Sequence, residues 1–298
     1  MPSALQPLLP VPELHAAIKN HYDGLISLYE DLWGEHIHHG YWDTPGDRNR
    51  HDAQLHLVEK LIEFAPLDRG TTVLDAGCGI GASAVHLAAA LDCSVTGITL
   101  SAEQVRRAGE KAAVAGVTDR TTFAVMDALH TEFADDTFDV VWALESCELM
   151  PDKEAFLTEC YRVLKPGGVL LVATWCARDD RLDPNETRLL QRIYRDFVVS
   201  HVLPLTDYRD LAGRIGFADV RADDWSDHVT DTWKLSSDIA KPLIKDPSQV
   251  WKLVRAKGVD IFRFINSVPL MRQAYDRKVM RYGVLRGVKP AAGTEAGR

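Results

Sequence analysis

The segment VLDAGCGIGASAV, residues 73–85, combines a carboxylate with three glycines at alternate positions. Glycine lets the backbone turn tightly, and it lets a ligand approach where a Cβ atom would otherwise stand. Such a loop between a strand and a helix is typical of nucleotide-binding folds. On spacing alone the signal is weak, because a tight turn that binds nothing has the same pattern.

Two cofactors compete for this loop. A nicotinamide dinucleotide would use Gly77, Gly79 and Ala82, and would need an acid about 20 residues further on to hold its ribose. Thr99 occupies that position. Asp75 stands two residues before the first glycine and favours S-adenosylmethionine, whose cationic α-amino group needs a nearby carboxylate.

The elements around the loop alternate between strand and helix. From residue 71 the chain runs through TTVLDAG, ASAVHLAAAL, SVTGITL and SAEQVRRAGEKAAVAG. Strands that are apolar throughout, separated by helices, predict a parallel sheet that is covered on both faces. We therefore expect a Rossmann-like, doubly wound α/β fold with a mostly parallel sheet.

Five motifs narrow the interpretation. VLDAGCGIG, VTGITLS, MDA, FDVVWALES and RVLKPGG resemble, in order and spacing, those of class I S-adenosylmethionine-dependent methyltransferases. EDLWGEHIHHGYWD, ITLSAEQVRRA and MRQAYDRKVMRYGVLRGVKP resemble the tocopherol C-methyltransferase type and its relatives, which include alkaloid N-methyltransferases. Bacterial sugar O-methyltransferases of indolocarbazoles are similar over the catalytic half. The tocopherol-type likeness covers about residues 20–290.

The resemblance implies which residues hold the cofactor. Asp75 and the backbone from Gly77 to Gly79 would hold the methionine end, and Thr99 and Gln104 would hold the ribose hydroxyls. Many relatives have an acid at the position of Thr99. The ribose contact here would therefore rely on a hydroxyl, on the amide of Gln104 or on the backbone.

At the adenine end, Asp127 would accept a hydrogen bond from the exocyclic amine, between apolar walls formed by Met126 and Ala128. Glu145 ends the fourth strand, at the sheet edge where open α/β folds bind ligands. Its backbone would border the methionine chain. Tyr22, on an amphipathic N-terminal helix, would face the sulfonium or the methionine carboxylate.

The segment HIHHGYWD, residues 36–43, has two interpretations. In an extended chain His36 and His38 share a face while His39 points away, and no pattern of Cys or carboxylates supplies further ligands. We therefore expect no metal. The methyltransferase likeness favours a lid over the cofactor, in which Tyr41 and Trp42 surround the sulfonium or pack the helix on the sheet.

The methyl acceptor is less defined. In relatives the stretch after the fourth strand usually carries a histidine that takes a phenolic or sugar proton. Here the stretch is ESCELM, with Glu145 and Glu148 but no histidine. Two carboxylates suit the stabilisation of positive charge. We expect them to be the catalytic residues in transfer to carbon or nitrogen of an aromatic, prenylated or alkaloid-like small molecule.

Two alternatives remain open. An O-methyltransferase of the same fold would need His201, His228 or Glu148 as its base. The other alternative is a non-catalytic, nucleoside-binding interaction subunit. The intact DxGxG loop and the aromatic lid argue against it, since a retired site need not keep either. Large apolar residues of the late segment either contact an aromatic substrate or pack among themselves; they are Trp225, Trp233, Trp251, Phe262 and Phe264.

Composition limits the partners. The 298 residues carry 34 Lys and Arg against 43 Asp and Glu, and the basic residues are scattered, which disfavours nucleic acid. No apolar run approaches the roughly 18 residues of a membrane span. Five cysteines without a CxxC spacing, and no signal-like N-terminus, favour a cytoplasmic protein with reduced thiols. The oligomeric state stays open.

We expect four regions. Residues 1–66 would form N-terminal helices and the cofactor lid, and residues 67–226 with 277–290 would form the methyltransferase core, whose last strand is antiparallel. Residues 227–276 would form a helical substrate cap. Residues 291–298 would be a disordered tail, because they have little to bury.

Overall fold

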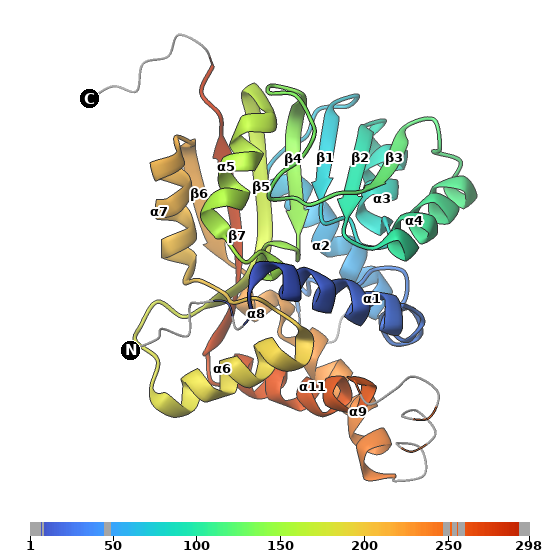
Figure 1. The fold of residues 1–298 in the computed structure, drawn as a ribbon, viewed down its shortest axis with the longest axis vertical. Helices are drawn as coiled ribbons and strands as arrows, with labels where there is room; N and C mark the ends of the chain where they lie inside the picture. Colours follow the sequence, from blue (N-terminus) through green and yellow to red (C-terminus); the bar gives the residue numbers. More distant parts are fainter. Residues whose placement is uncertain are drawn as a thin grey trace.

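The computed structural model describes residues 7, 9–44, 49–246, 251, 255 and 260–291 (Figure 1). Its centre is a seven-stranded sheet in the order β3-β2-β1-β4-β5-β7-β6. Strand β7 pairs antiparallel with both of its neighbours, and the other pairings are parallel. This confirms the predicted doubly wound, mostly parallel sheet with an antiparallel last strand. The strands are β1 Thr72–Ala76, β2 Ser94–Thr99, β3 Thr121–Val125, β4 Phe138–Leu144, β5 Leu164–Ala177, β6 Ala218–Asp224 and β7 Met280–Val288.

Helices cover both faces of the sheet, which is why its central strands are apolar throughout. On β4, Val140 and Trp142 face one core, which α2 and α3 complete. Val141 and Ala143 face a second core, which α5 and α7 complete. The covering helices are α2 Arg50–Phe64, α3 Ala82–Leu91, α4 Ala102–Ala115, α5 Lys153–Val163 and α7 Leu205–Ile215.

Two further layers lie beyond the carboxyl ends of the parallel strands. Helix α1 (Val11–Trp33) crosses these ends, and α6 (Pro184–Phe197), α9 (Asp231–Lys245) and α11 (Asp260–Asp276) lie together beyond it (Figure 1). The short element η1 (Cys147–Leu149) lies between β4 and α5, and α8 (Ser226–Val229) lies between β6 and α9. The carboxyl edge of the sheet is therefore enclosed.

The sequence placed the start of the outer, helical cap at residue 227, but the outer layer also contains an earlier helix. Helix α6, which the sequence assigned to the core, packs on α11, and Ser267 Oγ donates to Asp196 Oδ2 over 2.6 Å. It does so because Leu190, Ile193 and Phe197 give α6 an apolar stripe that the outer helices bury. Of the expected tail, residues 292–298 lie outside the described residues. Within the described part of the chain, no helix is both long and apolar enough to cross a membrane.

Candidate cofactor cleft and aromatic cavity

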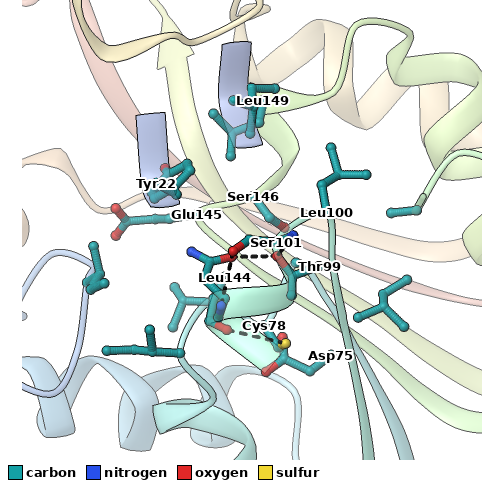
Figure 2. A pocket seen from close by; sticks show the side chains of 18 of the residues that line it. Tyr22, Asp75, Cys78, Thr99, Leu100, Ser101, Leu144, Glu145, Ser146 and Leu149 are labelled. Carbon is teal, nitrogen blue, oxygen red and sulfur yellow. Dashed lines mark hydrogen bonds between the residues drawn. The ribbon is translucent and has the colours of Figure 1, made fainter. Parts of the chain in front are cut away.

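A cleft of about 1040 Å³, counted out to its open mouth, lies between the carboxyl edge of the sheet and α1. In Figure 2 its labelled side chains converge from α1 (Tyr22), β1 (Asp75), β2 (Thr99) and the end of β4 (Leu144, Glu145). Every residue predicted to hold the cofactor lines this cleft: Tyr22, Asp75, Gly77, Gly79, Thr99, Gln104, Met126, Asp127, Ala128 and Glu145.

The glycine loop is shaped by backbone geometry. Gly77 has a φ of +100°, and a Cβ atom there would lie 2.3 Å from Ser146 Cβ. The amide groups of Gly77 and Cys78 both donate to the carbonyl oxygen of Ile98, each over 3.0 Å, which fixes the turn against β2. At Gly79 the nearest atom to an added Cβ is Gln104 Nε2, at 4.0 Å. The loop thus leaves room for a ligand beside Gly79.

Asp75 is the residue of the cleft whose surroundings best fit a cationic ligand. Its side chain is 2% exposed, and Oδ2 has no hydrogen-bond partner among the residues that the structure describes. Burial raises the pKa of this carboxyl to about 7. A buried acceptor without a donor is costly, and a cationic amine would both satisfy it and stabilise its charge. The residues present therefore fit the amino group of S-adenosylmethionine.

The predicted ribose residues form a small network. Thr99 Oγ1 donates to Gln104 Oε1 over 2.5 Å, so the amide NH2 of Gln104 is turned away from Thr99. Ser101 is the N-cap of α4, because its hydroxyl accepts a hydrogen bond from the backbone N–H of Gln104 over 3.0 Å. The same hydroxyl donates to Asp23 on α1. This contact ties the covering helix to the ribose side of the cleft.

At the adenine end, Asp127 Oδ1 accepts from the amide of Leu129 over 2.9 Å. Asp127 Oδ2 lies 3.8 Å from His15 Nδ1, on α1. His15 lines the cleft and was missed by sequence reasoning, because nothing local connects residue 15 with residue 127. Only the path of α1 across the sheet edge brings them together.

A second cavity, of about 500 Å³, adjoins the cleft. The two share Tyr22, Ile37, His38, Glu145 and Leu149 as lining residues. The second cavity is walled mainly by aromatic side chains, and we call it the aromatic cavity; these side chains are Tyr22, Tyr29, Trp33, Trp175, Phe197 and Trp233. Its position suits a methyl acceptor beside the cofactor cleft.

The late aromatic residues divide between several places. Trp233 lines the aromatic cavity, whereas Trp225 packs edge-on against Tyr41 and Phe64. Trp251 is 66% exposed. The side chains of Phe262 and Phe264 lie outside the described residues. Trp33, Trp175 and Phe197 complete the cavity from α1, β5 and α6, which the sequence did not indicate.

Glu148 faces the aromatic cavity and is 3% exposed. Thr174 Oγ1 donates to its Oε2 over 2.8 Å. Burial, and then the nearby Glu145, raise the pKa of Glu148 to about 8. At pH 7 the side chain is therefore mostly a neutral acid, which is poorly suited to the stabilisation of positive charge that we expected from the sequence.

Glu145 has all of its acceptor capacity in use. His39 N and Tyr282 Oη donate to Oε1 over 2.7 and 2.9 Å, and His39 Nδ1 and Trp175 Nε1 donate to Oε2 over 2.9 and 3.3 Å. Burial acts to raise its pKa, but the attraction of His39 and the hydrogen bonds that it donates outweigh burial, so this pKa lies below its ordinary value. The geometry favours an anchoring carboxylate over a reacting one.

Two histidines reach the cavities from the stretch from His36 to His39: His38 lines both cavities and His39 lines the aromatic cavity. His38 Nδ1 lies 2.7 Å from the His39 carbonyl oxygen, so it carries a proton. Burial lowers the pKa of His38 and, to about 2, that of His36, so both rings are neutral. His38 Nε2 must then accept from His36 Nδ1, 3.0 Å away. Among the described residues, no group of three His, Cys, Asp or Glu side chains converges as a metal site would require.

Tyr41 and Trp42 do not line either cavity. Tyr41 stacks on His228 at 4.4 Å, and the Trp42 amide donates to the His228 carbonyl oxygen over 2.9 Å. Both join the segment of residues 36–43 to α8, so of the two places expected for them, the one around the sulfonium is wrong. His228 is engaged in this contact. His201 is buried beside Ser200, and burial lowers its pKa to about 3. Neither histidine lines the described cavities.

Comparisons with known proteins agree with this geometry. Residues 74–172 match the family model described as a methyltransferase domain. The chain is 32% identical over 297 residues to the chloroplastic tocopherol O-methyltransferase of Arabidopsis thaliana, covering 93% of this chain and 83% of that protein. It is 35% identical over 288 residues to the 2-methyl-6-phytyl-1,4-hydroquinone methyltransferase of Synechocystis, covering 91% and 85%.

Two solved structures share the fold. The [4+2]-cyclase SpnF superposes with a TM-score of 0.80 at 25% identity, covering 92% of this chain and 96% of that one. Phosphoethanolamine N-methyltransferase 2 of Haemonchus contortus, solved with S-adenosyl-L-methionine, superposes with a TM-score of 0.72 at 21% identity, covering 92% and 60%.

Proposed function

We propose that this chain, which belongs to the class I S-adenosylmethionine-dependent methyltransferases and within them to the tocopherol methyltransferase-like proteins, methylates a ring carbon of a neutral phenolic molecule with an apolar substituent. Family membership makes it an enzyme and S-adenosylmethionine its cofactor. The non-catalytic alternative is therefore set aside. The acceptor and the methylated atom are the parts that we propose.

S-adenosylmethionine supplies an electrophilic methyl group. The residues of this chain would bind it through Asp75, the Gly77–Gly79 backbone, the Thr99 and Gln104 pair and Asp127, under the cover of α1. Tyr22 lies at the junction of the two cavities, where the cofactor cleft meets the aromatic cavity. Because methyl transfer is an in-line displacement, much of what the protein contributes is the positioning of the two reactants.

The observation that carries the proposal is the pairing of an aromatic wall with a neutral acid. Trp33, Trp175 and Trp233 offer broad apolar faces to a ring, and Glu148 offers one polar group among them. With a pKa of about 8, Glu148 is not the fixed anion that a substrate ammonium would need. The cavity therefore suits an uncharged hydroxylated ring better than a charged amine, and this supports our choice of carbon over nitrogen as the atom methylated.

A carboxyl group with a pKa near the working pH is suited to accept a proton. In its ionised form Glu148 would take the proton of the substrate hydroxyl, and the electron density that remains would make the neighbouring ring carbon nucleophilic. That carbon would bond to the methyl group as the methyl–sulfur bond breaks. The hydrogen on the methylated carbon would then leave as a proton to solvent, and Glu148 would return its proton to the ring oxygen. Glu148 lines the aromatic cavity but not the cofactor cleft. A substrate hydroxyl bound to Glu148 would therefore lie away from the place where the aromatic cavity meets the cofactor cleft. This placement favours a ring carbon over the oxygen as the atom methylated.

Oxygen methylation is the second candidate, and one observation favours it. His38 lines both cavities, which is where a base for the reacting oxygen itself would stand. In this structure both of its ring nitrogens have partners, so it would have to give up the contact with His36 first.

We place the reaction in natural-product biosynthesis and the enzyme in the cytoplasm as part of the same proposal.

The test uses S-adenosylmethionine with a deuterated methyl group and three acceptors: a prenylated hydroquinone, a simple phenol and an aromatic amine. We expect the hydroquinone to be the preferred acceptor, with NMR showing the label bonded to a ring carbon. Label found only on oxygen would replace the carbon proposal with the His38 alternative. Label found only on nitrogen would contradict both.

A further inference from the structure

We propose that His39 is a positioning residue that holds the outer helices on the sheet and thereby forms the acceptor cavity, so that acceptor binding requires its Nε2 atom while cofactor binding does not. The inference rests on the proposed function in one respect, namely that the aromatic cavity receives the acceptor. The residues concerned lie on the sheet, on the segment from residue 36 to residue 42 and on two outer helices.

His39 is joined to the sheet through one carboxylate. Its backbone N–H and its Nδ1–H both donate to Glu145, at the end of β4, over 2.7 and 2.9 Å. Tyr282, on β7, and Trp175, on β5, donate to the same carboxylate. Glu145 has a φ of +52°, a conformation that non-glycine residues adopt only when the surroundings hold it. Three strands therefore contribute to one anchor for this imidazole.

The opposite side of the ring is joined to the outer helices. Trp233 Nε1, on α9, donates to His39 Nε2 over 2.6 Å. Tyr275 Oη, on α11, lies 3.3 Å from the same atom. An indole N–H can only donate, so Nε2 must offer its lone pair and the ring proton must be on Nδ1. One tautomer of one histidine thus serves both sides.

The position of these groups relates them to the acceptor. His39, Glu145, Trp175 and Trp233 all line the aromatic cavity, whereas His39 and Trp233 do not line the cofactor cleft. The rings of Trp175, Trp233 and Phe197 also pack edge-on against one another, at centroid distances of 5.6 to 5.9 Å. Loss of the Nε2 contact would therefore loosen the Trp233 wall of the acceptor cavity and leave the cofactor contacts in place.

Two substitutions separate the two sides of the ring. In His39→Asn the amide nitrogen replaces Nδ1 and can still donate to Glu145, but nothing accepts from Trp233. In His39→Gln the amide oxygen reaches the place of Nε2 and can accept from Trp233. His39→Asn should weaken acceptor binding about tenfold, as expected when a buried donor loses its acceptor, and His39→Gln should restore most of it.

The measurement does not depend on knowing the acceptor. We would titrate 2-naphthol, as a neutral phenolic probe, into each variant saturated with S-adenosylhomocysteine, and measure S-adenosylhomocysteine affinity separately. His51→Asn, on the exposed side of α2, is the matched control and should change neither affinity. The supporting result is a tenfold loss of 2-naphthol affinity in His39→Asn only, with S-adenosylhomocysteine affinity changed less than about threefold.

A second variant tests whether the loss in His39→Asn comes from the contact with Trp233 or from general misfolding. Trp233→Phe keeps a ring at this site but removes the N–H, so it should add little to the loss already present in His39→Asn. Independent, additive losses in this double-mutant cycle would overturn the inference. So would equal loss in the Asn and Gln variants, or a parallel loss of S-adenosylhomocysteine affinity. If the probe behaves as expected but no phenol is methylated, the proposed function fails and the role of His39 stands.

Discussion

The ammonium group of Lys153 lies 2.6 Å from the carbonyl oxygen of Cys147, the residue immediately before Glu148. It also donates to the Met150 carbonyl oxygen over 2.7 Å. Lys153 is buried, and burial lowers its pKa to about 8. The side chain therefore fixes the η1 turn that carries Glu148, and its charge favours ionisation of that acid.

Lys153→Met should raise the pKa of Glu148 further, because a neighbouring positive charge is lost. We expect the rising limb of kcat/KM to move upward by about one pH unit, and Lys153→Arg to keep more of the native profile. The measurement is a rate profile between about pH 6 and about pH 9.5. An unchanged pH–rate profile in Lys153→Met would show that Lys153 does not influence the ionisation of Glu148.

Glu148→Gln keeps the size of the side chain but cannot accept the substrate proton. We expect kcat to fall on the order of 10²-fold and the remaining activity to lose its dependence on a group with a pKa near 8. Glu154→Gln, at an exposed position of α5, is the control and should be unaffected. Near-native kcat in Glu148→Gln would rule out its role as the base.

The same acid makes the fold less stable at higher pH. Its pKa is about 8 in the folded protein against an ordinary value of 4.5, so between these values the folded state holds a proton that the unfolded state has released. Stability should therefore be highest below about pH 5 with respect to this group and fall as the pH rises to about 8. Urea unfolding at several pH values should show this slope in the native protein and a smaller slope in Glu148→Gln.

Cofactor binding should release a proton from Asp75. Its pKa of about 7 means that the acid is largely protonated at pH 6, whereas the cofactor ammonium requires the carboxylate. The affinity for S-adenosylhomocysteine, which keeps that ammonium, should therefore weaken as the pH falls below 7. Calorimetry in two buffers of different ionisation enthalpy measures the released proton directly. Asp75→Asn should bind more weakly and show neither the pH dependence nor the proton release.

Gly77→Ala should prevent the glycine loop from adopting the conformation that binds the cofactor. The added methyl group would lie 2.3 Å from Ser146 Cβ, at a φ of +100°. We expect loss of S-adenosylhomocysteine binding and a lower thermal midpoint. Gly109→Ala is the matched control, because no atom lies within 4 Å of its added Cβ and the site is inside α4. A helix gains from this change, so the control should be neutral or slightly more stable.

The fold and the cofactor loop could be predicted because their determinants are contiguous. Asp75, Gly77 and Gly79 lie within five residues, at the point where an apolar strand gives way to a helix. Thr99 and Gln104 follow the next strand in the same way. The carboxyl ends of parallel strands meet at one edge, so strand order along the chain already implies that these residues share a cleft.

The acceptor cavity could not be predicted in this way. Trp33, Trp175 and Trp233 come from α1, β5 and α9, and no spacing in the sequence relates them. The motif HIHH was visible as a cluster, but its partner was not, since His39 meets Glu145 across 106 positions. Tertiary packing therefore decided whether this histidine was a ligand, a base or an anchor.

The ionisation states of Glu145 and Glu148 show the same division between what the sequence determined and what the tertiary structure decided. The sequence by itself determined that two acids follow the fourth strand, because residue type and strand end are local properties. It could not determine that one is held as a carboxylate by four donors while the other is mostly protonated at pH 7. That difference arises from desolvation and from donors on distant elements, which only the folded chain brings within reach.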